Sequence, residues 1–178
     1  NHTASALTGA TVKAQLHDLD GKAIGQAQQQ KLDIAPTSAP ALFTVPFDDA
    51  LPAFHLLRLT LTDAQGRQLS ENTYWRYRTE ASMHALNQLA YTQLATTLVS
   101  TKDGYTATIR NSGKTVAAMV RLSLRERNGT DRVLPTLYSD NYFWLLPGEV
   151  RTVTITPQRT VRTPRLLAEA YNSAPKLT

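Results

Sequence analysis

Short segments of alternating apolar and polar residues recur along the chain, and many of them end at a glycine-containing turn. In the clearest segment, every second residue from Val116 to Leu124 is apolar and is expected to point to the same side. Glycine turns are expected at Asp20-Gly21, Asp103-Gly104 and Asn128-Gly129. Short strands separated by such turns predict an all-β chain built from immunoglobulin-like sandwiches.

The alternating segments fall into two groups. The first group ends near Arg78 and predicts at least five strands, one of them at Phe43 to Phe47. In residues 79–91 apolar residues recur at a spacing of three, which predicts a helical turn or an extended linker. About seven strands are expected after it, so the prediction is two tandem immunoglobulin-like β-sandwiches. The expected divisions are a first sandwich in 1–80, a linker in 81–91 and a second sandwich in 92–178.

The run from Tyr138 to Glu149 is predicted to be a strand with aromatic residues on both faces, followed by a Pro-Gly turn. A strand at the surface of a small sandwich needs only one apolar face, so the second face requires a partner. The run Tyr74-Trp75-Arg76-Tyr77 repeats this arrangement. Its outward rings would either be covered by a neighbouring domain or stack on the apolar C–H face of a sugar. The candidate domain-interface or sugar-contact residues are Trp75, Tyr77, Tyr142 and Trp144.

Composition excludes several classes of protein. Of the 178 residues, 42% are hydrophobic and 19% charged, which is typical of a globular chain and not of a disordered one. The absence of cysteine removes disulfides, thiolate metal sites and cysteine nucleophiles. The net charge of +5 comes from scattered basic residues, so we expect no nucleic-acid partner. No apolar stretch reaches the roughly 20 residues of a membrane helix, so we expect no membrane partner.

Candidate catalytic groups are weak in this sequence. The four histidines form no ligand pattern, and no phosphate-binding or nucleophile motif is present, so we expect no metal, no cofactor and no catalytic residue. A glycosidase needs two carboxylates about 5–10 Å apart. The pairs Asp18/Asp20 and Asp48/Asp49 stand where turns are expected and would cap backbone donors. Asp140 is expected to make a local Asx-type bond, and Glu149 to lie on the rim of the Pro-Gly turn.

Several motifs of this chain carry a family resemblance. The segments Leu7-Thr-Gly-Ala10, Leu69-Ser-Glu-Asn-Thr-Tyr-Trp75, Asn111-Ser-Gly113 and Tyr138-Ser-Asp-Asn-Tyr-Phe143, with Leu146-Pro-Gly-Glu149, follow one another in a characteristic order. They resemble the C-terminal immunoglobulin-like domains of glycoside hydrolase family 2 enzymes. The similarity is to the exo-β-D-glucosaminidase and β-mannosidase type, including mannosylglycoprotein endo-β-mannosidase-like proteins.

The resemblance implies that the chain is a non-catalytic accessory region of a retaining glycoside hydrolase. Its partner would be the catalytic (β/α)₈ barrel of the same parent chain, and an oligosaccharide would be a second partner where the region borders the substrate cleft. Nothing in this sequence resembles the barrel, so no catalytic residue is carried over. The chain is expected to be a piece of a periplasmic or secreted protein, with the first strand of its first sandwich truncated.

Two other functions remain open from the residues alone. The same rings could give the chain independent affinity for carbohydrate, as in a carbohydrate-binding module. A sandwich pair could also act as an adhesin or a periplasmic chaperone-like protein, in which case an open edge strand would pair with a partner's strand.

Overall fold

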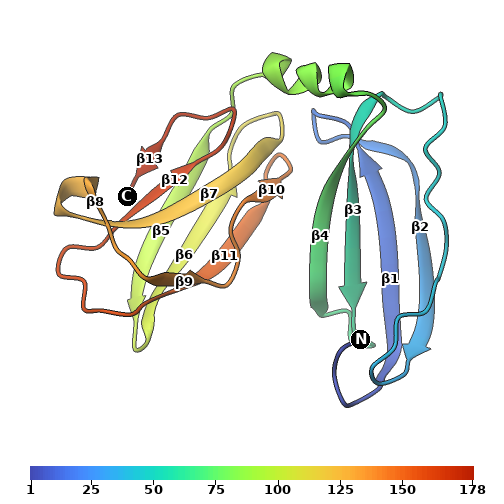
Figure 1. The fold of residues 1–178 in the computed structure, drawn as a ribbon, viewed down its shortest axis with the longest axis horizontal. Helices are drawn as coiled ribbons and strands as arrows, with labels where there is room; N and C mark the ends of the chain where they lie inside the picture. Colours follow the sequence, from blue (N-terminus) through green and yellow to red (C-terminus); the bar gives the residue numbers. More distant parts are fainter. The chain divides into compact units, whose positions relative to one another are not determined.

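The computed structural model describes residues 1–178, and it confirms the predicted all-β architecture (Figure 1). The chain divides into two compact units, unit 1 in residues 1–88 and unit 2 in residues 89–178. Unit 1 contains β1 (Leu7–His17), β2 (Ala23–Ile34), β3 (Phe54–Thr62), β4 (Gln68–Tyr77) and the 3-10 helix η1 (Glu80–Gln88). Unit 2 contains β5 (Leu94–Thr101), β6 (Gly104–Asn111), β7 (Ala117–Glu126), the short 3-10 helix η2 (Arg127–Gly129), β8 (Asp131–Arg132), β9 (Thr136–Tyr138), β10 (Phe143–Leu145), β11 (Val150–Pro157), β12 (Arg165–Glu169) and β13 (Lys176–Leu177).

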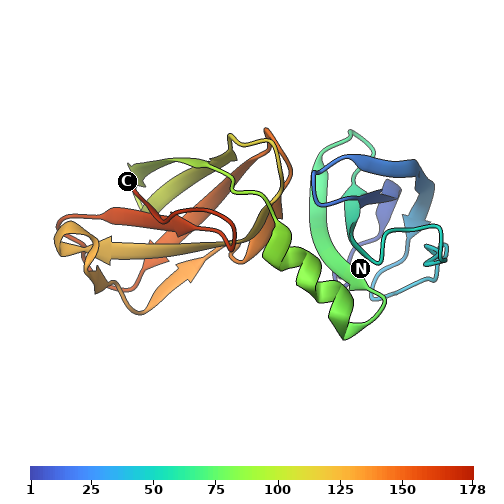
Figure 2. The ribbon, with the colours of Figure 1, turned by 90° about the horizontal axis from the view of Figure 1, so that it is seen from above.

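Unit 1 is built on one antiparallel sheet of four strands in the order β2-β1-β3-β4. The prediction of at least five strands was wrong, because the residues from Phe43 to Phe47 form no strand. They belong to segment 35–53, which runs beside the sheet without regular structure (Figures 1 and 2). Prolines explain this difference, since a proline has no N–H group to donate to a neighbouring strand. The segment contains Pro36, Pro40, Pro46 and Pro52.

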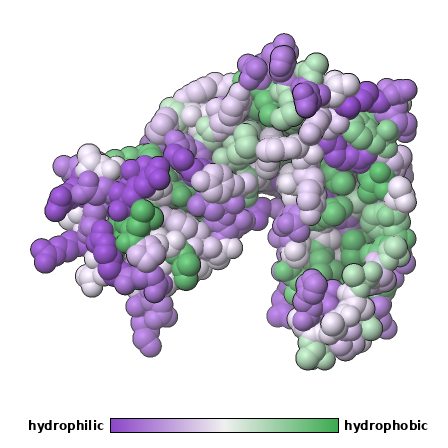
Figure 3. Space-filling view, viewed as in Figure 1, coloured by the Kyte–Doolittle hydropathy of each residue, from purple (hydrophilic) through white to green (hydrophobic).

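The two faces of the sheet in unit 1 differ in character. Residues that pair across antiparallel strands share a face, and β1 pairs with β3 so that Leu16 lies opposite Leu57. The face that contains this pair is called the aliphatic face, and it carries Val12, Ala14, Leu16, Leu57, Leu59 and Leu61. Of these six, only Ala14 is buried and the others are half-buried. Figure 3 shows hydrophobic residues gathered over the strands of unit 1.

Unit 2 is a sandwich of two antiparallel sheets (Figure 2). One sheet has the order β5-β6-β11-β9, and the other has the order β10-β7-β12-β13 with β8 paired to β7. Inward-facing residues of both sheets form one continuous core, as expected when two sheets pack face to face. Its larger members include Ile109, Leu124, Leu145, Val153, Ile155 and Leu166, each 1% exposed or less.

A β-bulge interrupts the strand that the sequence predicted most clearly. Along β7 the core includes Ala117 and then Val120, so Ala118 does not lie on the same face as Val120, contrary to the prediction. Met119 has a positive φ of 53°. The pairing of β7 with β10 shifts at this point, because Phe143 lies opposite Val120 while Leu145 lies opposite Ala117. An extra residue in one strand changes which side chains face the core.

The aromatic run of unit 2 is not one strand. β9 ends at Tyr138 and pairs with β11, whereas β10 begins at Phe143 and pairs with β7 in the other sheet. The prediction of a continuous strand through this run was therefore wrong. Residues 139–142 form a corner at which the chain crosses from one sheet of the sandwich to the other, and we call them the sheet-switch corner.

Candidate functional site

Side chains of the aromatic run bond directly to the backbone of β7. The amide of Asn141 accepts a hydrogen bond from the Leu122 N–H through Oδ1 at 2.8 Å and donates one to the Leu122 carbonyl through Nδ2 at 3.1 Å. The Tyr138 hydroxyl accepts a hydrogen bond from the Leu124 N–H at 2.7 Å. These groups satisfy backbone positions of β7 beyond Val120, the last residue of β7 that pairs with β10, whereas β12 pairs with β7 along its other edge.

The same corner is attached to β11 on its other side. The Ser139 N–H donates to the Thr154 carbonyl at 2.9 Å, and the Ser139 Oγ accepts from the Thr154 N–H at 2.9 Å. Asp140 was expected to make a local Asx-type bond, but its Oδ2 instead pairs with the Arg151 guanidinium at 2.8 Å. Arg151 also lies over the Phe143 ring, with its Cζ 5.2 Å from the ring centroid.

Tyr142 occupies the exposed tip of the sheet-switch corner. Its φ of 59° lies in the left-handed region, which is unfavourable for a bulky side chain. Its N–H donates to the Asn141 Oδ1 at 3.0 Å, and its side chain is 64% exposed. Beside it, Arg121 pairs with Glu169 through Nε at 2.7 Å. This bond raises the pKa of Arg121 against the opposing effect of partial burial, with a smaller contribution from Tyr142.

Trp144 has a different environment from Tyr142. It lies within β10 and is only 4% exposed, while Tyr142 precedes the strand and is largely in solvent. In a regular strand residues two apart, such as Tyr142 and Trp144, would share one face, but the left-handed conformation of Tyr142 breaks this alternation. Their assignment to a domain interface or a sugar contact remains a prediction.

Trp75 and Tyr77 lie together on β4 in unit 1. The register places Trp75 opposite Leu56 and Tyr77 opposite Phe54, so all four side chains share the face opposite to the aliphatic face. Leu56 is fully buried and Phe54 is 5% exposed, whereas Trp75 and Tyr77 are 38% and 41% exposed. The structure therefore brings these two predicted residues together as one half-exposed aromatic pair.

The carboxylates considered as catalytic candidates have structural contacts. Asp18 accepts hydrogen bonds from the N–H groups of Asp20 and Lys22 at 3.0 and 2.8 Å, and Asp48 accepts one from Ala50 at 3.0 Å. These contacts confirm the predicted turn-capping role for Asp18 and Asp48, whereas the carboxylate of Asp49 pairs with Arg78. Glu149 reaches back across the Pro-Gly turn, where its Oε2 accepts from the Leu146 N–H at 2.7 Å.

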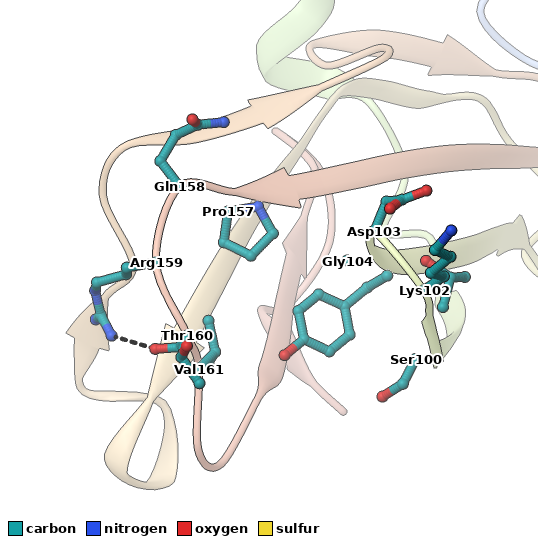
Figure 4. A pocket seen from close by; sticks show the side chains of 11 residues that line it. Ser100, Lys102, Asp103, Gly104, Pro157, Gln158, Arg159, Thr160 and Val161 are labelled. Carbon is teal, nitrogen blue, oxygen red and sulfur yellow. Dashed lines mark hydrogen bonds between the residues drawn. The ribbon is translucent and has the colours of Figure 1, made fainter.

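A hollow of about 530 Å³ lies at one end of unit 2, between the tip of the β5–β6 hairpin and the loop that follows β11 (Figure 4). The sequence predicted the hairpin turn but not this hollow. The second loop is fixed by Arg159, which pairs with Glu126 at 2.8 Å and donates to the Thr160 carbonyl at 3.1 Å. Tyr105 also lines the hollow, and its burial raises its pKa, which the nearby Glu126 carboxylate raises further. The residues that line the hollow and carry a hydroxyl group are Ser100, Thr101, Tyr105 and Thr160.

Residues 1–178 contain no group of three or more His, Cys, Asp or Glu side chains placed to hold a metal ion. Neither helical segment has the length and apolar character that crossing a membrane requires.

Two family models match the chain. The model described as the exo-β-D-glucosaminidase Ig-fold domain matches residues 72–173. The model described as the mannosidase Ig/CBM-like domain matches residues 1–77. Together they account for nearly the whole chain.

Individual relatives agree with these matches. An exo-β-D-glucosaminidase of Streptomyces avermitilis is 30% identical over 99% of this chain and 22% of its own length. One from Hypocrea jecorina is 28% identical over 84% of this chain and 20% of its own length. The chain therefore spans about a fifth of the length of these curated relatives.

Solved structures show the same relationship. The exo-chitosanase CsxA of Amycolatopsis orientalis superposes on 100% of the chain with a TM-score of 0.84, at 25% identity and over 24% of its own length. A β-D-mannosidase of Dictyoglomus thermophilum superposes on 97% of the chain and 19% of its own length with a TM-score of 0.62. At 15% identity, the second similarity shows a shared fold alone.

Proposed function

The chain belongs to the family of exo-β-D-glucosaminidase Ig-fold domains, and from this membership we propose that it is the non-catalytic accessory region of a longer retaining glycoside hydrolase. In this proposal the parent protein is of the exo-β-glucosaminidase or β-mannosidase type. Its chemistry belongs to a catalytic barrel elsewhere in the same parent chain.

The resemblance to immunoglobulin-like domains of glycoside hydrolase family 2, and the predicted immunoglobulin-like fold, are confirmed by the two family matches. One observation carries the proposed role. The chain aligns over 99% of its length with an exo-β-D-glucosaminidase, yet it corresponds to only 22% of that enzyme. In such relatives this region is one part of a larger glycosidase chain.

We propose that three of the exposed aromatic residues, Trp75, Tyr77 and Tyr142, are the contacts through which this region braces the catalytic domain. Trp75 and Tyr77 offer a half-exposed pair beside the buried Leu56, and Tyr142 is 64% exposed on the sheet-switch corner. Aromatic side chains bury a large area with few rotatable bonds and often dominate the energy of an interface. The rest of the parent chain is the occupant that the length comparison favours.

We also propose that the sheet-switch corner borders the substrate cleft. The left-handed backbone of Tyr142 costs of order 1–3 kcal/mol, and residues held in this way are concentrated at functional sites. The corner is attached to both sheets through Asn141 and Ser139, so the ring is presented from a fixed base. A ring presented in this way could stack on a pyranose unit at the edge of the cleft.

The bracing role is tested by making Trp75→Ala in the 178-residue chain and in the full-length parent protein. Because an interface contact is present only in the parent, the substitution is expected to cost about 2 kcal/mol more there than in the isolated chain. Tyr91→Ala, which removes another exposed ring (65% exposed), serves as the matched control. Equal losses in the two proteins would contradict the bracing role.

The accessory role has a separate test in activity. Only the full-length parent is expected to hydrolyse p-nitrophenyl β-D-glucosaminide or the corresponding mannoside, while the 178-residue chain releases no nitrophenol. Turnover by the isolated chain would overturn the assignment.

A further inference from the structure

His55 is a fully buried histidine on the aliphatic face of unit 1. It lies near the start of β3, is 0% exposed, and pairs across the sheet with Arg76 of β4. Because Leu57 is two residues further along the same strand, the two side chains point to the same face. Segment 35–53 reaches the sheet here, since the Phe47 ring meets the His55 ring edge-on with centroids 4.8 Å apart.

The contacts of His55 fit a neutral ring. Its Nδ1 lies 2.8 Å from the Pro52 carbonyl oxygen and donates a hydrogen bond to it. Its Nε2 is buried and has no hydrogen-bond partner. A neutral imidazole with the proton on Nδ1 satisfies both observations, whereas protonation would place an N–H group where there is no acceptor.

The charges around His55 also oppose its protonation. The guanidinium groups of Arg76 and Arg78 lie over the Phe47 ring, with Cζ 4.4 and 5.2 Å from its centroid. Arg76 donates to the Pro46 carbonyl at 2.9 Å. Arg78 pairs with Asp49 and donates to the carbonyls of Asp48 and Leu51, at 2.9 and 3.1 Å. These two arginines therefore fasten segment 35–53 to β4 while surrounding the histidine with positive charge.

The other elements around His55 offer it no counter-charge. Segment 35–53 contributes Asp48 and Asp49; Asp49 is paired with Arg78, and the carboxylate of Asp48 caps its own turn. η1 contacts β3 and β4 and carries Glu80 and His84, both exposed. β1 ends at His17, which pairs with Leu56 and so lies on the opposite face.

We propose that His55 is an acid-sensitive latch, whose protonation releases segment 35–53 from the aliphatic face of unit 1. A proton on the ring would add a third positive charge beside Arg76 and Arg78 and leave a buried donor unsatisfied. Opening of the segment relieves both effects by returning the ring to water. The rings of His55 and Phe47, which now contact each other, then become accessible. This inference concerns the segment itself and does not depend on the proposed accessory function.

The direction of the pH effect follows from linkage. Burial lowers the pKa of His55 and the two nearby arginines lower it further, against the effect of the bond to Pro52. The open form binds a proton more readily than the closed form, so the closed form is favoured above the ordinary histidine pKa of about 6.5. Its advantage is lost as the pH falls below that value towards the lowered pKa of the closed form.

Hydrogen–deuterium exchange of the 178-residue chain at pH 7.5 and pH 5.0, corrected for intrinsic exchange, tests the latch. Backbone amides of segment 35–53 are expected to lose protection at pH 5.0. The protection factor should fall about tenfold for each pH unit between the pKa of His55 in the open form and its lower pKa in the closed form. His55→Asn keeps a donor for Pro52, and His55→Phe keeps a ring for Phe47. Both substitutions remove the titration and are expected to abolish the loss, whereas His84→Asn behaves like the wild type.

Three results would overturn the latch. Protection of segment 35–53 that is equal at both pH values would show that His55 does not control it. An undiminished acid-induced loss in either His55 variant would assign the effect to another group. The third result is an NMR titration in which the His55 ring has a pKa at or above its ordinary value while segment 35–53 stays closed. This titration needs only the wild-type chain, so it tests the latch even if neither His55 variant folds.

Discussion

Asn141 takes the place of a strand residue opposite Leu122, with its side-chain amide accepting at 2.8 Å and donating at 3.1 Å to the two backbone groups of that residue. A side-chain amide carries the same donor and acceptor as a peptide group, so it can continue a β ladder for one position. The motif residues that carried the family resemblance therefore have a structural role in closing the sandwich where the chain changes sheets.

Replacing Asn141 measures the value of this closure. Asn141→Ala leaves the N–H and carbonyl of Leu122 without these partners and is expected to lower the free energy of unfolding by about 1–3 kcal/mol. Asn141→Asp keeps an acceptor for the Leu122 N–H but places a carboxylate oxygen, which cannot donate, against the Leu122 carbonyl, so its loss at pH 7 should be at least as large as that of Asn141→Ala. Urea unfolding measures both values. A clearly smaller loss for the Asp variant would show that the hydrogen bond to the Leu122 carbonyl contributes little.

Replacing Tyr142 tests whether its ring stabilises unit 2 or is instead displayed for a partner. Asparagine tolerates the left-handed region better than tyrosine, so Tyr142→Asn should leave the chain as stable as the wild type or stabilise it by up to about 1 kcal/mol. The neighbouring Phe143 is 7% exposed within the core, and Phe143→Ala should cost about 3–5 kcal/mol. Thermal unfolding compares the two variants. Marked destabilisation by Tyr142→Asn would mean that the ring supports unit 2 itself and is not displayed for a partner.

Glu126 gives unit 2 a predictable dependence on acid. The hydrogen bond from Arg159 lowers the pKa of Glu126, and the Arg162 N–H lowers it further. The stabilising contribution is therefore complete above the ordinary glutamate pKa of about 4.3 and is lost as the pH falls through the lowered value. Urea midpoints between pH 6 and pH 2.5 should fall less steeply in Glu126→Gln than in the wild type. Parallel curves for the two proteins would show that Glu126 does not contribute to the acid dependence of unit 2.

The sequence predicted the parts of the fold that depend on local pattern. Alternation and glycine turns predicted hairpins such as the one at Asp103-Gly104, which joins β5 to β6. The sheet-switch corner could not be predicted in this way, because an alternating run looks the same whether it stays in one sheet or crosses to another. The bulge at Met119 was missed for a related reason, since it shifts the core face from Ala118 to Ala117 without changing the apolar pattern.

The candidate site was predictable in residue type but not in exposure. The sequence singled out Trp75, Tyr77, Tyr142 and Trp144 as aromatic residues in need of a partner. The structure leaves three of them exposed by 38% or more, whereas Trp144 is 4% exposed. What covers a ring depends on contacts between distant segments, and these contacts are not encoded in the periodicity around it. The burial of His55 likewise could not be predicted from the sequence around it, because the residues that contact or pair with it are Phe47 and Arg76 of β4.

The two tryptophans allow the accessory role to be tested against independent sugar binding. Because Trp75 is 38% exposed and Trp144 only 4%, a sugar that stacks on a tryptophan of this chain should change the fluorescence of Trp75. For an accessory region we expect no saturable change on titration with glucosamine or mannose oligosaccharides up to millimolar concentration. Trp75→Phe is the matched control, since it leaves Trp144 as the one emitting tryptophan. A saturable shift in the wild type that disappears in this variant would instead establish a carbohydrate-binding module, with Trp75 as its contact residue.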